Sequence, residues 1–512
     1  MVVRASPILV PMLVQLHPVL ESDTMSNLET TPAPTSMATG SDTAAISELN
    51  AAFAAARQAF EANRNPSLAE RRARIEALMQ MMLNNRERIS AALSDDFGSH
   101  PVPASDLIEV LGVVGRARYV LAHLEEWMQP SPRDTDTTVL GTSKAYIQSQ
   151  PKGVIGNIVP WNFPFDLSVG PLIEMLAAGN RVIIKPSEYA PACAELLRQM
   201  VTEALDPTVV YIAVGGPELA RDFSSLPWNH LLYTGGPGVG RQVMAAAARN
   251  LTPVTLELGG KCPAVMTPGA VTARNVESVI GTKVIKNGQM CISVDYCLVP
   301  RKDLQTFVEL AQAFMRAAAP DYSRGTECTG IITLRHLDRL QDLLREARDR
   351  RSQIVELERA GTVDRVTRRM PLSLVIDPAL DLRIMQEEIF GPILPVVPYD
   401  NVADAVAFVN AGERPLGLYV FGADQAVIDS VVGNTTSGGV AVNACAIQGA
   451  LPSLAFGGVG MSGMGRHHGI EGFREFSNQR GIVVRGTGDI IDSFYAPYSK
   501  AAAVVQAALA GS

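Results

Sequence analysis

The sequence has few cysteines, and none of them lie close enough in sequence to form a CxxC pair. Only six occur in 512 residues. A chain this long with so few cysteines has neither a disulfide framework nor the ligand spacing of a zinc site, so we expect no metal. The pattern favours a reducing compartment, and we predict a cytoplasmic protein. The six are Cys193, Cys262, Cys291, Cys297, Cys328 and Cys445.

An excess of basic charge and a long hydrophobic run are also missing. The chain has 44 basic and 52 acidic side chains and no basic stripe, which argues against a nucleic-acid partner. The opening stretch MVVRASPILVPMLVQLHPVL is apolar, but prolines interrupt it and no small-residue cleavage site follows. We therefore predict no signal peptide and no membrane span. Residues 1–43 are interpreted as a disordered leader, with Met25 as an alternative start.

The composition is that of a large α/β protein. Apolar residues make up 47% of the chain, and its length predicts two large domains. Apolar residues at helical spacing predict helices over 43–130, and alternation around a glycine predicts a hairpin over 136–153. From residue 154 onward, short apolar runs alternate with Ala-rich helical segments, which is typical of a doubly wound parallel sheet. A second α/β set begins after Gly260, so we expect a hinge near 258–260.

Two turns after predicted strands are candidate nucleotide-binding sites. YTGGPGVG, residues 233–240, opens a helix, and its glycines allow the backbone to approach a pyrophosphate. It does not match GxGxxG, however, and glycine-rich turns are common in α/β proteins. RVIIKPSE, residues 181–188, places Lys185 and Glu188 past a strand end, where an acidic residue can bind ribose hydroxyls. The alternative for this pair is a solvated strand exit.

Three polar side chains in apolar surroundings are candidate catalytic groups. Cys291, in NGQMCIS, is either a small buried residue or a nucleophile. Glu257, in LELGGK, is either a general base whose pKa is raised by burial or a strand-end carboxylate paired with a lysine. Asn162, in VPWNFPF, is either a rigid polar donor or the cap of a turn. Taken singly, each has a structural explanation that is at least as good as the catalytic one.

The order of these stretches along the chain resembles the aldehyde dehydrogenase superfamily. The set covers roughly residues 45–495 and reads IVPWNFPF, KPSE, TGGPGVG, LELGGK, GQMC, EEIFGP and FGGVGMSGMGRHHG. EVLGVVGRA, GQMCISVDYCLVP, MQEEIFGPILPV and SGMGRHHGIEGF look most like the class 3 group and its coniferyl aldehyde dehydrogenase branch. The resemblance implies an α/β fold with a Rossmann-like NAD-binding domain, an α/β catalytic domain and a small bridging β element.

The resemblance also implies an activity and its catalytic residues. An aldehyde, either aromatic and coniferaldehyde-like or of medium to long chain, would be oxidised to the acid through a cysteine thioester. Cys291 would be the nucleophile, and Asn162 together with the backbone N–H of Cys291 would bind the oxyanion, where each donor contributes roughly 3 kcal/mol. Glu257 would activate the water that hydrolyses the thioester. A carboxylate in this role favours release of a free acid over transfer to coenzyme A.

A cofactor site follows from the same resemblance. Lys185 and Glu388 would hold the adenine-side and nicotinamide-side riboses, and Phe390 would lie beside the nicotinamide. Glu188 favours NAD over NADP, because a 2′-phosphate would meet a like charge, although NADP stays an alternative. The predicted cofactor-binding residues are Pro160, Trp161, Lys185, Ser187, Glu188, Gly235, Gly236, Gly240, Glu388 and Phe390.

The chain departs from the family pattern at several positions. Gly236 and Pro237 replace the usual Ser or Asn and small residue, which removes a side-chain contact to phosphate. Lys286 stands where an Asn is usual, and Ala455 replaces a common Pro. Residues 442–454 lack the usual His and Asp near the expected substrate mouth. Two alternatives therefore remain, namely a catalytically impaired member acting as a binding or structural protein and an acylating semialdehyde dehydrogenase.

Domain boundaries and assembly complete the expectations. The NAD-binding domain is expected over 44–135 and 151–257, and the catalytic domain over 258–440. Residues 136–150 and 480–512 are expected to form oligomerisation or bridging segments. An exposed hairpin can pair with the sheet edge of another subunit, so we predict a homodimer.

Overall fold

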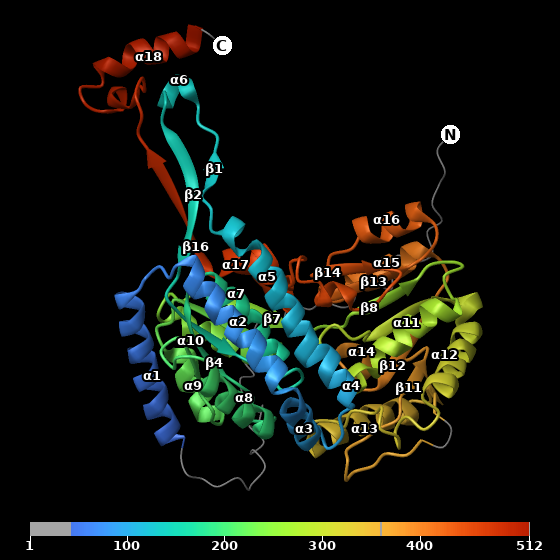
Figure 1. The fold of residues 1–512 in the computed structure, drawn as a ribbon. Helices are drawn as coiled ribbons and strands as arrows, with labels where there is room; N and C mark the ends of the chain where they lie inside the picture. The colour runs from blue at the N-terminus through green and yellow to red at the C-terminus, as the bar shows by residue number, and fades with distance from the viewer. Residues whose placement is uncertain (1–41, 359–360, 511–512) are drawn as a thin grey trace, which may run out of the picture. The chain divides into compact units, whose positions relative to one another are not determined.

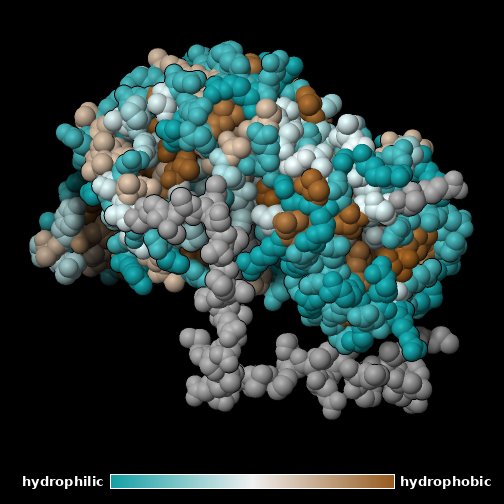
Figure 2. Space-filling model, turned by 90° about the horizontal axis from the view of Figure 1, so that it is seen from below, coloured by the Kyte–Doolittle hydropathy of each residue, from teal (hydrophilic) through white to brown (hydrophobic). Residues whose placement is uncertain are grey.

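The computed structural model describes residues 42–358 and 361–510 (Figure 1). The predicted leader, residues 1–43, lies outside the described residues except for its last two positions. Within the described ranges, no helix combines the length and apolar character needed to cross a bilayer. The face drawn in Figure 2 is mainly hydrophilic, with separate hydrophobic patches.

Helices dominate the first part of the described chain, as the apolar spacing predicts. Helix α2 begins in a capping box, in which the Ser67 hydroxyl accepts from the Glu70 N–H and the Glu70 carboxylate accepts from the Ser67 N–H. Helix α3 ends at Gly98, which is in the left-handed conformation. The helices are α1 (Thr43–Ala62), α2 (Leu68–Asn84), α3 (Arg86–Phe97), α4 (Val102–Ala104), the π-helix η1 (Ser105–Gly112) and α5 (Val113–Trp127).

A six-stranded sheet follows, in the order β15-β7-β6-β3-β4-β5. All its pairs are parallel except β15 with β7. The chain runs outward from β3 to β5 and then returns to place β6 on the other side of β3. This reversal makes a crevice at the carboxyl ends of β3 and β6. The strands are β3 (Val154–Ile158), β4 (Arg181–Lys185), β5 (Val210–Ile212), β6 (His230–Gly235), β7 (Val254–Leu258) and β15 (Gly463–Met464).

Helices cover both faces of this sheet. Ile155 and Ile184 pack in one hydrophobic cluster with α2, α3, α5, α7 and α8, and their neighbours Val154 and Ile183 pack in another with α1, α9 and α10. Burial on both faces explains why these strands are almost continuously apolar. The helices after β3 are α7 (Asp166–Ala177), α8 (Pro191–Ala204), α9 (Pro217–Ser225) and α10 (Pro237–Ala248).

Gly259 and Gly260 lead from β7 into a second sheet of seven strands, in the order β10-β11-β12-β9-β8-β13-β14. Only β10 runs antiparallel to its neighbour. Helices α11 and α12 pack on one face and α13, α15 and α16 on the other. The strands are β8 (Pro263–Met266), β9 (Tyr296–Pro300), β10 (Gln353–Glu356), β11 (Ser373–Ile376), β12 (Ile393–Tyr399), β13 (Gly417–Phe421) and β14 (Gly439–Val442).

The helical segments around the second sheet are mostly short. They are α11 (Ala273–Val284), α12 (Leu304–Ala318), α13 (Leu334–Asp349), α14 (Arg383–Gln386), α15 (Val402–Ala411) and α16 (Gln425–Gly433), with single turns of 3₁₀-helix at η2 (Ile285–Gly288), η3 (Arg301–Asp303), η4 (Ile447–Ala450) and η5 (Gly460–Ser462).

A third sheet joins early and late parts of the chain. Strands β1 (Ser131–Arg133), β2 (Lys144–Pro151) and β16 (Ser477–Val484) are antiparallel in that order. The hairpin therefore differs from the one expected over 136–153. Asp136 caps a helical turn, α6 (Thr137–Leu140), with its carboxylate, so the first arm lies earlier, at β1. In Figure 1, β2 and β16 form a long ribbon with α6 and α18 at its far end. The remaining segments are α17 (Gly469–Glu475), η6 (Ile491–Phe494) and α18 (Ser499–Ala510).

Candidate active site

Cys291 lies half-buried in the loop between η2 and β9. The loop is tightly constrained, because Gly288 has φ +76° and a Cβ there would meet the carbonyl oxygen of Gly391 at 2.3 Å. The thiol of Cys262 donates to the carbonyl oxygen of Cys291 at 3.3 Å. The other five cysteines are fully buried. Cys291 is thus the least buried of the six cysteines.

The electrostatic surroundings of Cys291 favour the neutral thiol. Its pKa is raised to about 12, chiefly by burial and then by the Glu388 and Glu257 carboxylates, while the backbone N–H groups of Cys291 and Ile292 oppose the shift. At neutral pH the sulfur is therefore protonated. To react as a nucleophile, it must pass its proton to an acceptor or be joined by a positive charge.

Glu257 lies in β7 with 3% of its surface exposed. Neither oxygen of its carboxyl group makes a hydrogen bond to another described residue. Burial raises the pKa of Glu257 well above its usual value, against the opposing effect of the Arg466 and Arg116 guanidiniums. The carboxyl has no hydrogen bond within the described residues and is close enough to Cys291 to alter the pKa of that thiol. The strand-end ion pair with a lysine is absent among the described residues.

A chain of buried polar groups stands behind Glu257. Glu174 accepts two hydrogen bonds from Arg116, both 2.7 Å, and the Arg116 guanidinium donates to Nδ1 of His467 at 3.0 Å. Because arginine only donates, the proton of neutral His467 lies on Nε2, which is 3.8 Å from Glu257 Oε1. Sequence reasoning missed these residues. The signal was the paired histidine in GMGRHHG, next to a recognised glycine-rich motif.

Asn162 reaches the loop that carries Cys291. Its Nδ2 donates to the carbonyl oxygen of Gln289 at 3.2 Å, and the side chain is 3% exposed. Gln289 is itself fixed, because its amide donates to the carbonyl oxygens of Lys286 and Gly330 at 2.9 and 3.0 Å. Asn162 therefore contacts the loop that carries Cys291, although the two residues are 129 positions apart in sequence. The second N–H of the Asn162 amide donates to no other group within the described residues.

Several predicted cofactor residues lie along the carboxyl ends of β3 and β4. Lys185, the last residue of β4, is 2% exposed and pairs with Glu188 at 2.7 Å. The Ser187 hydroxyl accepts from the N–H of Tyr189 at 3.2 Å. Pro160 and Trp161 follow β3, and the Trp161 ring meets the Phe390 ring edge to face, with centroids 5.3 Å apart. The Lys185–Glu188 pair places a cation and an acceptor together at the crevice beside β3.

The predicted phosphate-binding turn lies at the end of β6, which is next to β3. Gly235 ends the strand, and Gly236 precedes Pro237, the first residue of α10. No side chain caps this helix, so its first N–H groups are free of side-chain acceptors. A Cβ on Gly236 would meet nothing within 4 Å, whereas one on Gly240 would meet Leu258 at 2.9 Å. The uncapped helix start fits a pyrophosphate, and Gly240 serves close packing.

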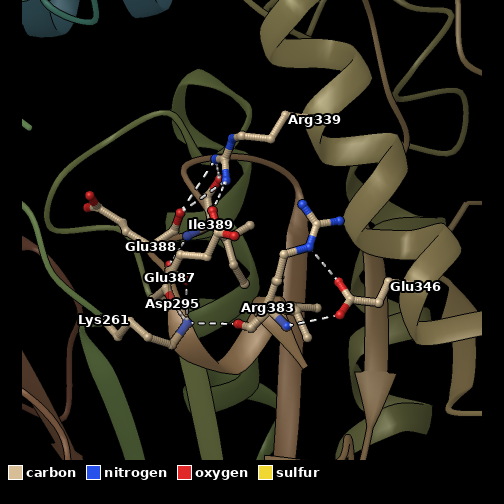
Figure 3. A network of polar contacts seen from close by, with 9 residues as sticks. Lys261, Asp295, Arg339, Glu346, Arg383, Glu387, Glu388 and Ile389 are labelled. Atoms are coloured by element: carbon tan, nitrogen blue, oxygen red, sulfur yellow. Dashed lines mark hydrogen bonds and ion pairs between the residues drawn. The ribbon is translucent and has the colours of Figure 1, made fainter. Parts of the chain in front are cut away.

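The segment that holds Glu388 and Phe390 is clamped from both sides (Figure 3). Lys261 Nζ donates to the carbonyl oxygens of Ile384 and Glu387, at 2.8 and 3.0 Å. Arg339 contacts the carbonyl oxygen of Glu388 at 3.4 Å from the other side. Burial, with the Asp295 carboxylate, raises the pKa of Glu388 to about 8. The side chain fits only beside a glycine, because a Cβ on Gly259 would meet Glu388 Oε2 at 2.1 Å.

The sequence and the structure of the chain both match known proteins. The pattern of the aldehyde dehydrogenase family matches residues 21–482. A probable coniferyl aldehyde dehydrogenase from Caulobacter vibrioides is 42% identical over 430 residues, which are 83% of this chain and 89% of that protein. The substrate-bound structure of Staphylococcus aureus AldH has a TM-score of 0.84 and 30% identity, covering 90% of this chain and 99% of that one.

A structure that contains the cofactor is also similar. The aldehyde dehydrogenase of Mycobacterium tuberculosis complexed with NAD+ has a TM-score of 0.77 and 27% identity, and the match covers 86% of this chain and 91% of that one. The fold, the family pattern and the relatives agree with one another over most of both chains. The chain belongs to the aldehyde dehydrogenase family.

Proposed function

We propose that the protein oxidises an aldehyde to the carboxylic acid with NAD or NADP, through a thioester on Cys291 that Glu257-activated water hydrolyses. The observation that supports this most is the convergence of three groups. Asn162 donates to the carbonyl oxygen two residues before Cys291, and the Glu257 carboxylate acts on the pKa of the Cys291 thiol. A nucleophile, an oxyanion donor and a base thus come from three separate segments of the chain, two loops and strand β7.

Each group has one task in the proposed reaction. The Cys291 thiol loses its proton to solvent, and the backbone N–H groups of Cys291 and Ile292 stabilise the thiolate. The sulfur then bonds to the aldehyde carbon, and the carbonyl oxygen becomes an oxyanion that the free Asn162 N–H and the Cys291 backbone N–H bind. Such donors are worth roughly 3 kcal/mol each. When bound, the oxidised nicotinamide supplies a positive charge and accepts the hydride.

The second half of the reaction releases the acid. Loss of the hydride leaves a thioester on Cys291, and water adds to its carbonyl carbon. Glu257 takes a proton from that water, the C–S bond breaks as the acid forms, and the departing sulfur takes the proton from Glu257 to return the thiol and the carboxylate. A carboxyl without a hydrogen bond in the described chain and with a raised pKa suits a base that must be both protonated and ionised in one cycle.

The residues at the strand ends fit a dinucleotide. Lys185 and Glu188 would bind the adenine-side ribose, and the uncapped start of α10 at Gly236 would face the pyrophosphate. Glu388 would hold the nicotinamide-side ribose, with Phe390 and Trp161 beside the ring. The exposed Glu188 carboxylate favours NAD, because a 2′-phosphate would meet a negative charge there.

An aromatic aldehyde of the coniferaldehyde type is the proposed substrate class. The support is the 42% identity to the probable coniferyl aldehyde dehydrogenase of Caulobacter vibrioides. Values of kcat/KM for cinnamaldehyde-type, benzaldehyde-type and aliphatic aldehydes, each with NAD and NADP, test the proposal. A preference for medium or long aliphatic aldehydes would contradict the aromatic assignment and leave the chemistry intact.

The hydrolytic step is tested with Glu257→Gln. The variant should release one equivalent of NADH per active site in a burst and then turn over about a hundredfold to a thousandfold more slowly than wild type. Steady turnover at the wild-type rate would contradict the role of Glu257. A wild-type protein that turns over only when coenzyme A is added, and that releases an acyl-coenzyme A in place of the free acid, would indicate an acylating enzyme.

The domain division and the assembly are proposals on the same footing. We assign residues 44–135 and 151–257 to the cofactor domain and 258–440 to the catalytic domain, because β7 and β8 belong to different sheets on either side of Gly259 and Gly260. Strand β16 pairs with β2 on one side and lies at the sheet edge on the other, which supports a homodimer paired through that edge.

A cytoplasmic location is supported by the six free thiols.

A further inference from the structure

A buried ion pair lies outside the groups that the proposed chemistry uses. Lys286 Nζ and Glu109 Oε1 are 2.7 Å apart, and the two side chains are 1% and 0% exposed. The Lys286 ammonium also lies over the rings of Phe97 and Phe163, 4.7 and 4.6 Å from their centroids. A charge buried this deeply is stable only with its partner in place. The pair joins η1, which carries Glu109, to η2, which carries Lys286 and leads into the loop that carries Cys291.

The second oxygen of Glu109 holds the segment that carries Asn162. Glu109 Oε2 accepts from the backbone N–H groups of Phe165 and Asp166, at 3.1 and 2.9 Å. These residues begin α7 and follow Asn162 by three and four positions. One carboxylate therefore binds the Asn162 segment through its Oε2 and, through its Oε1, Lys286 in η2 just before the Cys291 loop.

The backbone of Lys286 continues the connection toward Cys291. Its φ and ψ are 50° and 26°, a left-handed conformation that a lysine rarely adopts. Its carbonyl oxygen accepts from the N–H and from the side-chain amide of Gln289, at 3.1 and 2.9 Å. The carbonyl oxygen of Gln289 in turn accepts from Asn162. Lys286, Gln289, Asn162 and Glu109 close a ring of contacts around the oxyanion site.

We propose that Glu109 and Lys286 are positioning residues that set the distance between the Asn162 amide and the backbone N–H of Cys291. The inference rests on the proposed function, because it concerns the oxyanion that forms there. Neither side chain touches the substrate. The pair holds the two donors where the negative oxygen develops, and its loss allows the two segments to separate. A displacement of about 1 Å at such a site can cost as much as a hundredfold in rate.

Two reactions of the Cys291 thiol separate positioning from general damage, and neither needs a cofactor. Acylation by p-nitrophenyl acetate passes through an oxyanion and is followed by nitrophenolate absorbance. Alkylation by iodoacetamide forms no oxyanion and reports only the accessibility and ionisation of the sulfur. Lys286→Met should lower the acylation rate about tenfold or more, while alkylation changes less than about threefold. The ratio of the two rates is the readout.

Further variants complete the test. Asn162→Ala should lower the same ratio. Adding Lys286→Met to Asn162→Ala should lower the ratio little further, because both changes act through the same Asn162 donor. Glu109→Gln, which keeps an acceptor for the Phe165 and Asp166 N–H groups, should fold well and lower the ratio more mildly. Arg71→Met is the control for lost stability, since it removes a buried cation bonded to Pro66 and Ala177, away from this ring. It should leave the ratio unchanged.

The outcomes are distinct. A wild-type protein that is not acylated at Cys291, as judged by mass spectrometry, contradicts the proposed function and with it the positioning role. The positioning proposal alone is overturned if the wild-type protein is acylated but the Lys286 and Glu109 variants lose both reactions equally. It is also overturned if these variants lose neither reaction. If Lys286→Met does not fold, an unchanged ratio in Glu109→Gln overturns it as well.

Discussion

At the scale of single residues, burial sets the ionisation of the proposed nucleophile. The pKa of the Cys291 thiol is raised to about 12, so the thiolate fraction at pH 7 is very small in the protein without nucleotide. Below that pKa, the thiolate fraction and therefore the rate of alkylation should rise about tenfold per pH unit. Iodoacetamide kinetics between pH 7 and 10 measure this. A plateau near pH 8 would show that the pKa is not raised.

Nucleotide choice is a second property of single residues. Glu188 is 37% exposed at its side chain and pairs with Lys185, so a 2′-phosphate would lie near a carboxylate. Glu188→Gln should raise kcat/KM for NADP relative to NAD by about threefold to tenfold, because it removes a like charge at a partly solvated site. Glu195→Gln, an exposed change on α8, serves as the control. An unchanged NADP/NAD ratio would remove Glu188 from the ribose site.

At the scale of elements, the start of α10 is a phosphate site without a side-chain contact. Gly236 has φ −74° and ψ 147°, which any residue adopts, and a Cβ there has open space. Gly236→Ser should therefore fold normally and bind NAD about threefold to tenfold more tightly through one added hydrogen bond. Gly236→Ala isolates the effect of the hydroxyl. Equal affinities for the serine and alanine variants, measured by calorimetry, would show that the pyrophosphate lies elsewhere.

Sequence patterns predicted elements well where a local signal existed. Strands such as β4 and β7 are the apolar runs that the sequence indicates, and Glu257 lies in β7, while Lys185, expected just past its strand, is the last residue of β4. The first arm of the hairpin was placed wrongly, because the capping of α6 by Asp136 is a local competitor of strand pairing. Strand β15 has only two residues, which is too short for any periodicity to reveal.

The residues that connect elements were beyond the reach of sequence patterns. Glu109 and Lys286 are 177 positions apart. Each taken alone looks like an ordinary charged side chain on a helix or loop. The same holds for Arg116 and Glu174, whose burial as a pair depends on the packing of α5 on α7. Sequence motifs marked Cys291, Glu257 and Asn162, because a family resemblance had fixed their order. The contacts that hold them in place become visible only in three dimensions.

At the scale of the whole molecule, the third sheet is the proposed dimer contact. Strand β16 exposes Val483 and Val484 at the sheet edge, with 63% and 51% of their surfaces accessible. The Val483→Lys and Val484→Lys double variant should shift the protein from dimer to monomer, because charged side chains on an edge strand oppose pairing. Light scattering at micromolar concentration measures the mass. A wild-type monomer would contradict the proposal before any variant is made.

The central claim is that Cys291 carries the substrate as a thioester. The direct measurement is the mass of Glu257→Gln after mixing with NAD and cinnamaldehyde, quenched in acid during the NADH burst and mapped by peptide. We expect one acyl group on the peptide that contains Cys291, in proportion to the NADH released, and neither adduct nor NADH in Cys291→Ser. NADH released without an adduct on Cys291, or released by Cys291→Ser, would contradict it.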